Sequence, residues 1–382
     1  MRFHRDKNFI YPWRDGNAFE LIVDGEYYFP QIFQHIDNSS CFIILEQYLV
    51  ESGRITTLLI DHLVKASQRG VAVFLLFDEY GAQKLRSHDR QRLYDANIQL
   101  RFYNPVKLQH WYGNLRRNHR KFICIDGTSG FTGGAGFTDE FDTVDNPLGW
   151  HDVQLKISGP VLADWLTSFN LIWSQYASSV IDTAVEQALT DSNMQGRLTI
   201  AHTPRHQEIS HSLIKQIRRS YQTVWLATPY FVAPRKLRRE LKRAAQRGVD
   251  VRLLLANTHS DHPWITHAYR SYYRKLLQHG VRIFEYQPRF LHAKVILCDQ
   301  WTSIGSSNLD RWNRRWSMDA NQEINNKPFS DEIRTFFEND FKQSREILLA
   351  EWNKRGWLQR FKEKCCQKIV LLLEMLGRSH RN

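Results

Sequence analysis

Residues 118–140 read NHRKFICIDGTSGFTGGAGFTDE, and residues 291–310 read LHAKVILCDQWTSIGSSNLD. Both stretches contain a histidine, a lysine two residues later and an aspartate five residues after that, followed by a loop rich in glycine or serine. The polar residues of the first stretch recur 173 residues later in the second: His119, Lys121 and Asp126 as His292, Lys294 and Asp299. One constant offset for three polar residues indicates that the chain contains an internal duplication.

Each motif is predicted to lie on a buried strand. HRKFICID and HAKVILCD are rich in Phe, Ile, Val and Leu and are bounded by turn residues. Because side chains alternate along a strand, a histidine and a lysine two residues apart face the same side. Imidazole can act as nucleophile, base or acid near neutral pH, and a lysine with a Gly/Ser loop can hold phosphate oxygens. Two copies face to face would place a nucleophile and a proton donor on opposite sides of a phosphorus, as a two-step displacement requires.

The α/β pattern around the motifs is also duplicated. The first half is predicted to contain strands at 41–48, 71–78 and 98–105, with helices over 53–69 and near 82–95 between them. The second half repeats this order, with strands at 223–231, 250–257 and 281–288 and helices over 234–249 and 263–279. Arg-Gly-Val ends the first helix of each half, at Gly70 and Gly248. We therefore predict an α/β fold of two pseudo-symmetric halves, each a mixed β-sheet flanked by helices, packed around one shared active site.

The predicted organisation has four parts. The first half covers residues 1–175, a polar, helix-prone connection covers 176–198, the second half covers 199–345, and a helical tail covers 346–382. The tail holds six basic residues and one acid between 354 and 368, and its apolar residues, Trp357, Leu358 and Phe361 among them, fall mostly on one helical face. Such a helix either lies in an anionic membrane surface or packs on the body with a solvated basic face.

Composition favours an anionic partner. The 382 residues include 52 Lys and Arg against 40 Asp and Glu, a net charge of +12 that suits anionic lipid or nucleic acid. The five cysteines form no CxxC or His/Cys cluster of the kind that binds zinc. The N-terminal segment lacks the apolar core of a signal peptide, and no apolar run reaches the ~20 residues of a spanning helix. We expect a protein that is cytosolic or held at a membrane surface.

The two motifs resemble the paired HKD motifs of the phospholipase D superfamily, and the resemblance covers nearly the whole chain. ATPYFVAP at 227–234, RRNHRKFICIDG, GSSNLDRWN and GFTDEFDTVDNPLGWHD are similar to the bacterial cardiolipin synthase branch. This resemblance implies two phospholipase D-type halves and a phosphatidyltransferase that needs no metal or other cofactor. Such an enzyme moves a phosphatidyl group from phosphatidylglycerol to a second lipid alcohol through a phosphohistidine.

The resemblance leaves other activities open. A phospholipase D-type hydrolase is the first alternative, and a nuclease or phosphodiesterase of the same superfamily is a second, while a non-catalytic membrane-binding protein is disfavoured by the two intact motifs. The expected partners are an anionic phospholipid substrate and a membrane surface, with no nucleic acid. The expected location is peripheral, on the cytoplasmic side of the cell membrane.

The resemblance also assigns roles to the motif residues. It implies that His119 is the nucleophile and His292 the general acid, although the family leaves this order partly open. The lysines, Lys121 and Lys294, would bind phosphate oxygens. The aspartates, Asp126 and Asp299, either take part in catalysis or cap the turns that follow their strands.

Loop and carboxylate candidates complete the predicted site. Gly133, Gly134, Ser307 and Asn308 form either an oxyanion cradle or tight turns without a ligand. A histidine nucleophile needs a carboxylate to fix its tautomer; Asp152 is the candidate in the first half, and Asp319 or Glu323 in the second. The chain departs from the family pattern twice, because Gly136 stands where an Asn is usual and the second motif is one residue shorter between Asp299 and Gly305.

Overall fold

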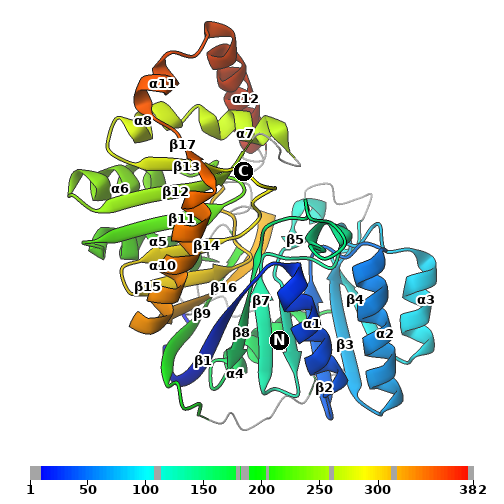
Figure 1. Ribbon diagram of the computed structural model, residues 1–382. Helices are drawn as coiled ribbons and strands as arrows, with labels where there is room; N and C mark the ends of the chain where they lie inside the picture. The colour runs from blue at the N-terminus through cyan, green and yellow to red at the C-terminus, as the bar shows by residue number, and fades with distance from the viewer. Residues whose placement is uncertain are drawn as a thin grey trace, which may run out of the picture. The chain divides into compact units, whose positions relative to one another are not determined.

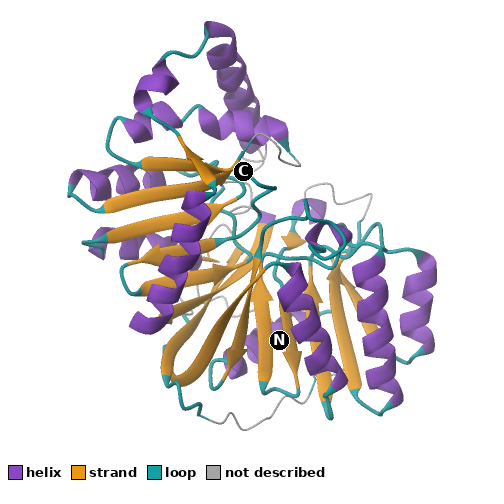
Figure 2. Ribbon diagram, viewed as in Figure 1, coloured by secondary structure: helices purple, strands orange, loops and turns teal. Residues whose placement is uncertain are grey.

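The computed structural model describes residues 10–106, 113–177, 181, 189–203, 206–257, 262–310 and 316–376. Two compact α/β units make up the chain (Figures 1 and 2). Unit 1 comprises Met1–Ile209, Ser303–Ser307 and Trp316–Asn326, and unit 2 comprises Ser210–Thr302, Asn308–Arg315 and Lys327–Asn382. Two segments from late in the sequence therefore belong to unit 1, which the predicted division at 176–198 does not anticipate. Part of that predicted connection lies outside the described residues, and its end is already strand.

Unit 1 is built on a mixed sheet. Its parallel strands are β2 (Phe42–Gln47), β3 (Ala72–Asp78) and β4 (Gln99–Tyr103). The sheet continues from β2 through antiparallel partners: β6 (Phe122–Ile125), β7 (Ser129–Gly133), β8 (Val153–Ser158) and β1 (Arg14–Val23). Short 3-10 turns lie at Gly113–Leu115 and Asp139–Phe141.

Helices cover both faces of this sheet, as Figure 1 shows. On one face lie α1 (Gly25–Asp37), α2 (Arg54–Gln68) and α3 (Ser87–Asp95), and on the other lies α4 (Leu162–Trp173). Aromatic and aliphatic side chains of α1 and α2 share one buried core with Ile43, Leu45 and Leu75 of the sheet. On the opposite face Trp165 of α4 stacks on Phe122, with ring centroids 4.7 Å apart. β6 is therefore buried from both sides, as its apolar sequence predicts.

One strand from late in the sequence completes unit 1. β16 (Ser317–Asn325) pairs antiparallel with β9 (Met194–Thr203), which also pairs with β1 and with β10 (His206–Gln207). β16 pairs in parallel with β5 (Arg117–Asn118), the two residues that precede His119. This pairing carries Asp319 to the first motif.

Unit 2 repeats the central arrangement of unit 1. Parallel strands β11 (Thr223–Thr228), β12 (Asp250–Ala256) and β13 (Arg282–Tyr286) are flanked by antiparallel β14 (Val295–Cys298) and β17 (Ser344–Glu346). β15 (Trp301–Gly305) follows β14 in the chain. The helices are α5 (Glu208–Arg219), α6 (Arg235–Gln246), α7 (Pro263–Arg270), α8 (Tyr273–Leu277), α10 (Lys327–Lys342), α11 (Leu349–Asn353) and α12 (Trp357–Leu376).

The predicted duplication is confirmed by the strand pairing. The order β4, β3, β2, β6 in unit 1 corresponds to β13, β12, β11, β14 in unit 2, with the same parallel and antiparallel relations. Gly70 and Gly248 end equivalent helices with φ angles of 92° and 90°, a conformation that favours glycine. The predicted helix over 263–279 is two helices, α7 and α8, and α3 begins later than predicted.

Candidate active site

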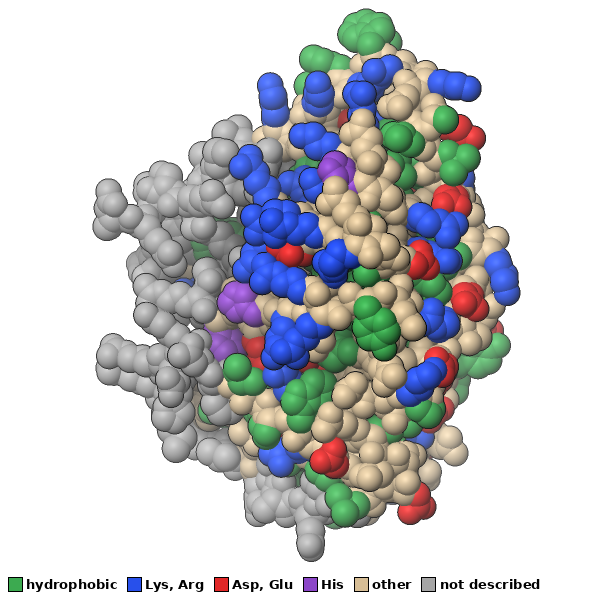
Figure 3. Space-filling model, turned by 90° about the vertical axis from the view of Figure 1, so that its left-hand side faces the viewer, with side chains coloured by type: hydrophobic (Ala, Val, Ile, Leu, Met, Phe, Trp, Pro, Cys, Tyr) green, Lys and Arg blue, Asp and Glu red, His purple; other side chains and the backbone are tan. Residues whose placement is uncertain are grey.

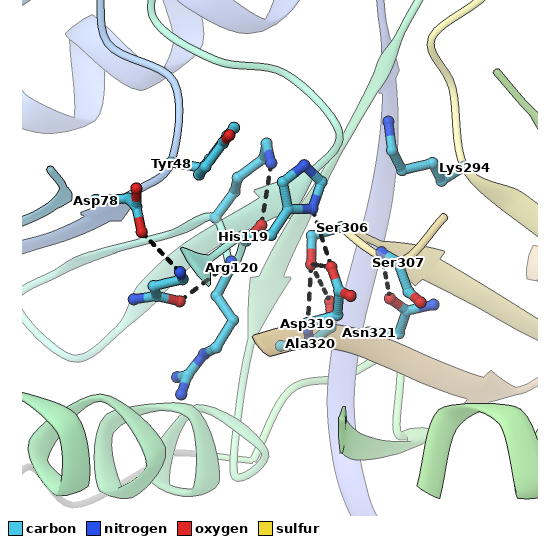
Figure 4. Close-up of polar contacts among 12 residues, drawn as sticks. Tyr48, Asp78, His119, Arg120, Lys294, Ser306, Ser307, Asp319, Ala320 and Asn321 are labelled. Atoms are coloured by element: carbon cyan, nitrogen blue, oxygen red, sulfur yellow. Dashed lines mark hydrogen bonds and ion pairs between the residues drawn. The ribbon is translucent and has the colours of Figure 1, made fainter. Parts of the chain in front are cut away.

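His119 is held between two strands of unit 1. Its backbone N–H donates to the carbonyl of Met318 on β16 at 2.9 Å. His119 precedes β6, which begins at Phe122, and is not part of that strand as predicted. Its Nδ1 lies 2.9 Å from Oδ1 of Asp319, a carboxylate that is 1% exposed (Figure 4). Because a carboxylate only accepts, Nδ1 carries a proton, and the neutral imidazole then has its lone pair on Nε2. In that tautomer Nε2 can act as a nucleophile.

The carboxylate itself is positioned by further hydrogen bonds. The hydroxyl of Ser306 donates to Oδ1 of Asp319 at 3.1 Å, and the backbone N–H of Ala320 donates to that hydroxyl. Asn321, on the same strand, accepts from the N–H of Ser307 and donates to the hydroxyl of Ser303. Sequence reasoning missed Ser306 and Asn321, whose roles depend on the antiparallel β16.

This arrangement corrects the expected pairing of histidine and carboxylate. The sequence assigned Asp152 to His119, but the structure gives His119 the carboxylate of Asp319, because β16 belongs to unit 1. Asp152 is fully buried and accepts from the N–H of Val153 at 2.7 Å. Glu323, the rival to Asp319, forms an ion pair with Arg197 at 2.7 Å.

The lysine and an aromatic ring complete the first motif. Nζ of Lys121 donates to the carbonyl of His119 at 3.0 Å. The ring centroid of Tyr48 lies 4.9 Å from that of His119 and 5.5 Å from Nζ of Lys121, so both motif side chains lie against one tyrosine. Burial raises the pKa of the Tyr48 hydroxyl well above its usual value, so the hydroxyl stays neutral. Tyr48 follows β2 directly, and only the antiparallel register of β2 with β6 brings it to this place.

The second motif has the same local geometry within unit 2. Nζ of Lys294 donates to the carbonyl of His292 at 2.7 Å and lies 3.1 Å from its Nδ1. Both side chains are buried, at 8% and 3% exposure for His292 and Lys294. Phe290 lies 6.1 Å from the imidazole centroid and 6.3 Å from the ring of Tyr230. The lysine-to-carbonyl bond therefore recurs in both motifs, as the duplication predicts.

The two motif aspartates anchor turns. Asp126 has a φ of 52°, and its carboxylate accepts from the backbone N–H groups of Ser40, Cys41 and Phe42 at the start of β2. Partial burial acts to raise the pKa of this carboxyl, but those hydrogen bonds hold it below its usual value. Of the two roles that the sequence left open for Asp126, these contacts favour the turn.

Asp299 repeats this arrangement with a φ of 54°. Its carboxylate accepts from consecutive N–H groups at the start of β11, those of Tyr221, Gln222 and Thr223. Both carboxylates lie at the end of their strand away from the histidine, which argues against a direct catalytic role.

The glycines of the first loop are required by close approach. A Cβ on Gly133 would come within 2.2 Å of the carbonyl of Val153, and one on Gly134 within 2.4 Å of the Asp152 carboxylate. Gly136, where an Asn is usual in the family, has the carbonyl of Leu49 2.7 Å from an added Cβ. This packing explains why the departure from the family pattern is a glycine. Asn308 of the second loop is 7% exposed and belongs to unit 2.

The surface of unit 2 is strongly basic. α6 exposes Arg235, Lys236, Arg239 and Arg243, while its single acid is buried and ion-paired with arginines. Figure 3 shows the side of the molecule on which α6 lies in Figure 1, and there Lys and Arg side chains clearly outnumber Asp and Glu. Such a surface suits an anionic partner.

No helix of the described chain is long and apolar enough to cross a bilayer. Among the described residues, no group of three or more His, Cys, Asp or Glu side chains could hold a metal ion.

Comparison with known proteins gives one consistent result. The family model described as "Cardiolipin synthase, PLD-like domain" matches residues 32–146 and 213–341. Cardiolipin synthase A of Pseudomonas putida (strain W619) is 30% identical over 369 residues, covering 95% of this chain and 76% of that protein. Cardiolipin synthase of Halalkalibacterium halodurans is 31% identical over 362 residues, covering 93% of this chain and 72% of that protein.

A solved structure shares the fold. The crystal structure of phosphatidylserine synthase from Haemophilus influenzae Rd KW20 matches with a TM-score of 0.75, covering 97% of this chain and 96% of that one. At 14% sequence identity this similarity concerns the fold alone.

Proposed function

The chain belongs to the phospholipase D superfamily, in its cardiolipin synthase-like branch, and we propose that it is a phosphatidyltransferase that makes cardiolipin from phosphatidylglycerol. One observation carries the proposal: Nδ1 of His119 is held by the buried Asp319 in the tautomer that leaves Nε2 as the nucleophile. A carboxylate at Nδ1 also stabilises the positive charge that the imidazole gains when Nε2 forms a bond to phosphorus.

The proposed reaction has two steps. Nε2 of His119 attacks the phosphorus of phosphatidylglycerol, and the bond from phosphorus to the glycerol oxygen breaks as His292 gives that oxygen a proton. His292, now neutral, accepts the proton of a hydroxyl on a second phosphatidylglycerol, whose oxygen attacks phosphorus and breaks the bond to His119. The products are cardiolipin and glycerol, and both histidines return to their starting protonation states.

This sequence of steps requires both motifs to act on one phosphorus. The support is the duplication itself, since each unit supplies one histidine and one lysine with the same local bonds. Lys121 and Lys294 would stabilise the negative charge on the phosphate oxygens. Water in place of the lipid hydroxyl would give phosphatidic acid, so hydrolysis is an outcome that the same assay detects.

An assay of purified protein on phosphatidylglycerol vesicles tests this proposal. Products are separated by thin-layer chromatography and identified by mass spectrometry, for the wild type and for His119→Ala, His292→Ala and His279→Ala. We expect cardiolipin from the wild type and from His279→Ala, whose imidazole Nδ1 lies 2.8 Å from the carbonyl of Lys275 on α8, and none from the motif variants. Phosphatidic acid as the sole lipid product would make the enzyme a hydrolase, and unchanged activity in His119→Ala would refute the mechanism.

We also propose that unit 2 places the enzyme peripherally on the cytoplasmic side of the cell membrane through α12. Trp357, Leu358 and Phe361 are 72%, 65% and 63% exposed at the start of this helix. Exposed basic residues surround them: Lys354, Arg360, Lys362, Lys364 and Lys368. The one acid of this segment, Glu363, is buried and ion-paired with Arg355. Exposed aromatic rings beside lysines suit the interface of an anionic bilayer.

Vesicle flotation tests this membrane contact. The double variant Trp357→Ser/Phe361→Ser should lose most of its binding to vesicles that contain phosphatidylglycerol. The matched control is Tyr94→Ser, which removes an exposed aromatic ring of α3 in unit 1 and should bind like the wild type. Equal binding by the double variant and the wild type would exclude α12 as the contact.

A further inference from the structure

A buried charged network lies under the first motif. The carboxylate of Glu46 on β2 is fully buried, its Oε1 accepts from Nδ2 of Asn118 at 2.6 Å, and its Oε2 lies 3.0 Å from Nη2 of Arg120. The N–H of Arg120 donates to Oδ1 of Asn118 at 3.3 Å. Asn118 and Arg120 are the residues on either side of His119, and Figure 4 shows the Arg120 side chain pointing away from the imidazole. The network therefore does not face the phosphate side of the motif.

Burying these groups is unfavourable in itself. Burial raises the pKa of the Glu46 carboxyl, an effect that the charge of Arg120 and the hydrogen bond from Asn118 oppose. Arg120 is 2% exposed and also donates to the carbonyl of Ser168 on α4. A buried ion pair of this kind is seldom more stable than apolar side chains of similar volume, so stability alone does not account for it.

Unit 2 forms the same strand arrangement with apolar residues at these three positions. The residues equivalent to Asn118 and Arg120, on either side of His292, are Leu291 and Ala293. Glu46 pairs with Phe122 across β2 and β6, and the equivalent pair across β11 and β14 is Ala227 with Val295. Leu291, Ala293 and Ala227 are all buried. The duplicated fold is therefore built once with three polar residues and once with three apolar ones.

We propose that Glu46, Asn118 and Arg120 are positioning residues that fix His119 as the nucleophile of the pair. Residues 119–121 lie between β5 and β6 and belong to neither strand, so contacts from neighbouring elements hold them in place. The network holds residues 118 and 120 from the α4 side, and Met318 and Asp319 hold residue 119 from β16. His292 has no such network at the equivalent positions. This inference rests on the proposed function for the role of His119.

The test transfers the apolar set of unit 2 into unit 1. The triple variant Glu46→Ala/Asn118→Leu/Arg120→Ala removes all three partners together and leaves no buried charge unpaired. We expect this variant to fold, because unit 2 folds with these residues. We also expect its kcat to fall about 10- to 100-fold and its KM to change less than about twofold, as for other groups that support a catalytic residue. If it does not fold, Glu46→Gln/Arg120→Gln, which keeps polar atoms in nearly the same volume, takes its place with the same expectations.

A second readout does not depend on the substrate. Nitrogen-15 spectra of the histidine side chains, with the His119 signal identified from His119→Ala, report which ring nitrogen carries the proton. We expect the wild type to show a single Nδ1–H tautomer and the triple variant a mixture of tautomers. If the wild type makes no product from lipid, the proposed function fails but this readout still decides the positioning role.

The control removes another buried ion pair. Arg270 and Glu285 of unit 2 lie 3.2 Å apart, and Arg270→Met/Glu285→Leu should leave both kcat and the His119 spectrum unchanged. The proposal is overturned if the triple variant keeps the wild-type kcat and tautomer, or if the control variant loses as much activity as the triple variant.

Discussion

Replacement of Asp319 by asparagine tests the central contact of the site. The carboxylate is 1% exposed, and its Oδ1 accepts from His119 at 2.9 Å and from Ser306 at 3.1 Å. Asparagine keeps the volume and one acceptor oxygen, but it removes the negative charge that, in the proposed mechanism, stabilises the imidazole when phosphorus bonds to Nε2. A hydrogen bond to a charged group contributes about 1.5–3 kcal/mol, and about 1.4 kcal/mol corresponds to tenfold in rate. We therefore expect Asp319→Asn to lower kcat by about 10- to 100-fold.

The stability of this variant separates the charge from the packing. Asp319→Asn should unfold near the wild-type denaturant midpoint, whereas Asp319→Ala should lose about 1–3 kcal/mol of unfolding free energy, because it leaves buried hydrogen-bonding groups of Ser306 and His119 without their acceptor. Turnover is measured on phosphatidylglycerol vesicles at several substrate concentrations, so that kcat and KM are obtained separately. KM should change little.

Two comparison variants decide whether the reasoning holds. Glu323→Gln, on the same strand, should keep kcat within about threefold, because Glu323 forms an ion pair with Arg197. Asp152→Asn tests the pairing that the sequence predicted for His119. Wild-type turnover by Asp319→Asn together with a large loss in Asp152→Asn would refute the assignment of Asp319 to His119.

Three further predictions concern the first motif. Lys121→Met should lower kcat about 100- to 1000-fold on the same vesicles if its ammonium stabilises phosphate oxygens, and a loss below tenfold would contradict that role. Tyr48→Phe should stay within about threefold of the wild type because the ring makes the contacts to His119, while Tyr48→Ala should lose at least about tenfold; equal losses would implicate the hydroxyl instead. Asp126→Asn should lower the melting temperature at neutral pH with little change in turnover. Because the folded pKa of Asp126 is lowered, its stabilisation is present above the usual carboxyl pKa of about 4 and is lost as the pH falls through the folded value. The gap in melting temperature between wild type and variant should therefore close in acid, and a gap that persists there would contradict this explanation.

The sequence alone determined the duplicated α/β framework of this protein. Strand periodicity and the Arg-Gly-Val helix ends are local signals, and each depends on residues that are close in the chain. The constant offset between His119 and His292 likewise needs no tertiary information. The same local pattern also located both motif lysines and the glycines of the first loop, where an added Cβ would clash with the Val153 carbonyl or the Asp152 carboxylate.

Only the tertiary structure decided which groups surround His119. Asp319 is 200 residues away in the sequence, Tyr48 and Glu46 are about 70 residues away, and each reaches the site through a strand register. The pairing of β16 with β9 and β5 places a late strand in unit 1, which an internal repeat in the sequence does not indicate. Register depends on which distant strands bury their faces together, and a shift of one residue would turn Asp319 away from the imidazole. The chain therefore specifies the motif locally, and the sheet selects the carboxylate that contacts its histidine.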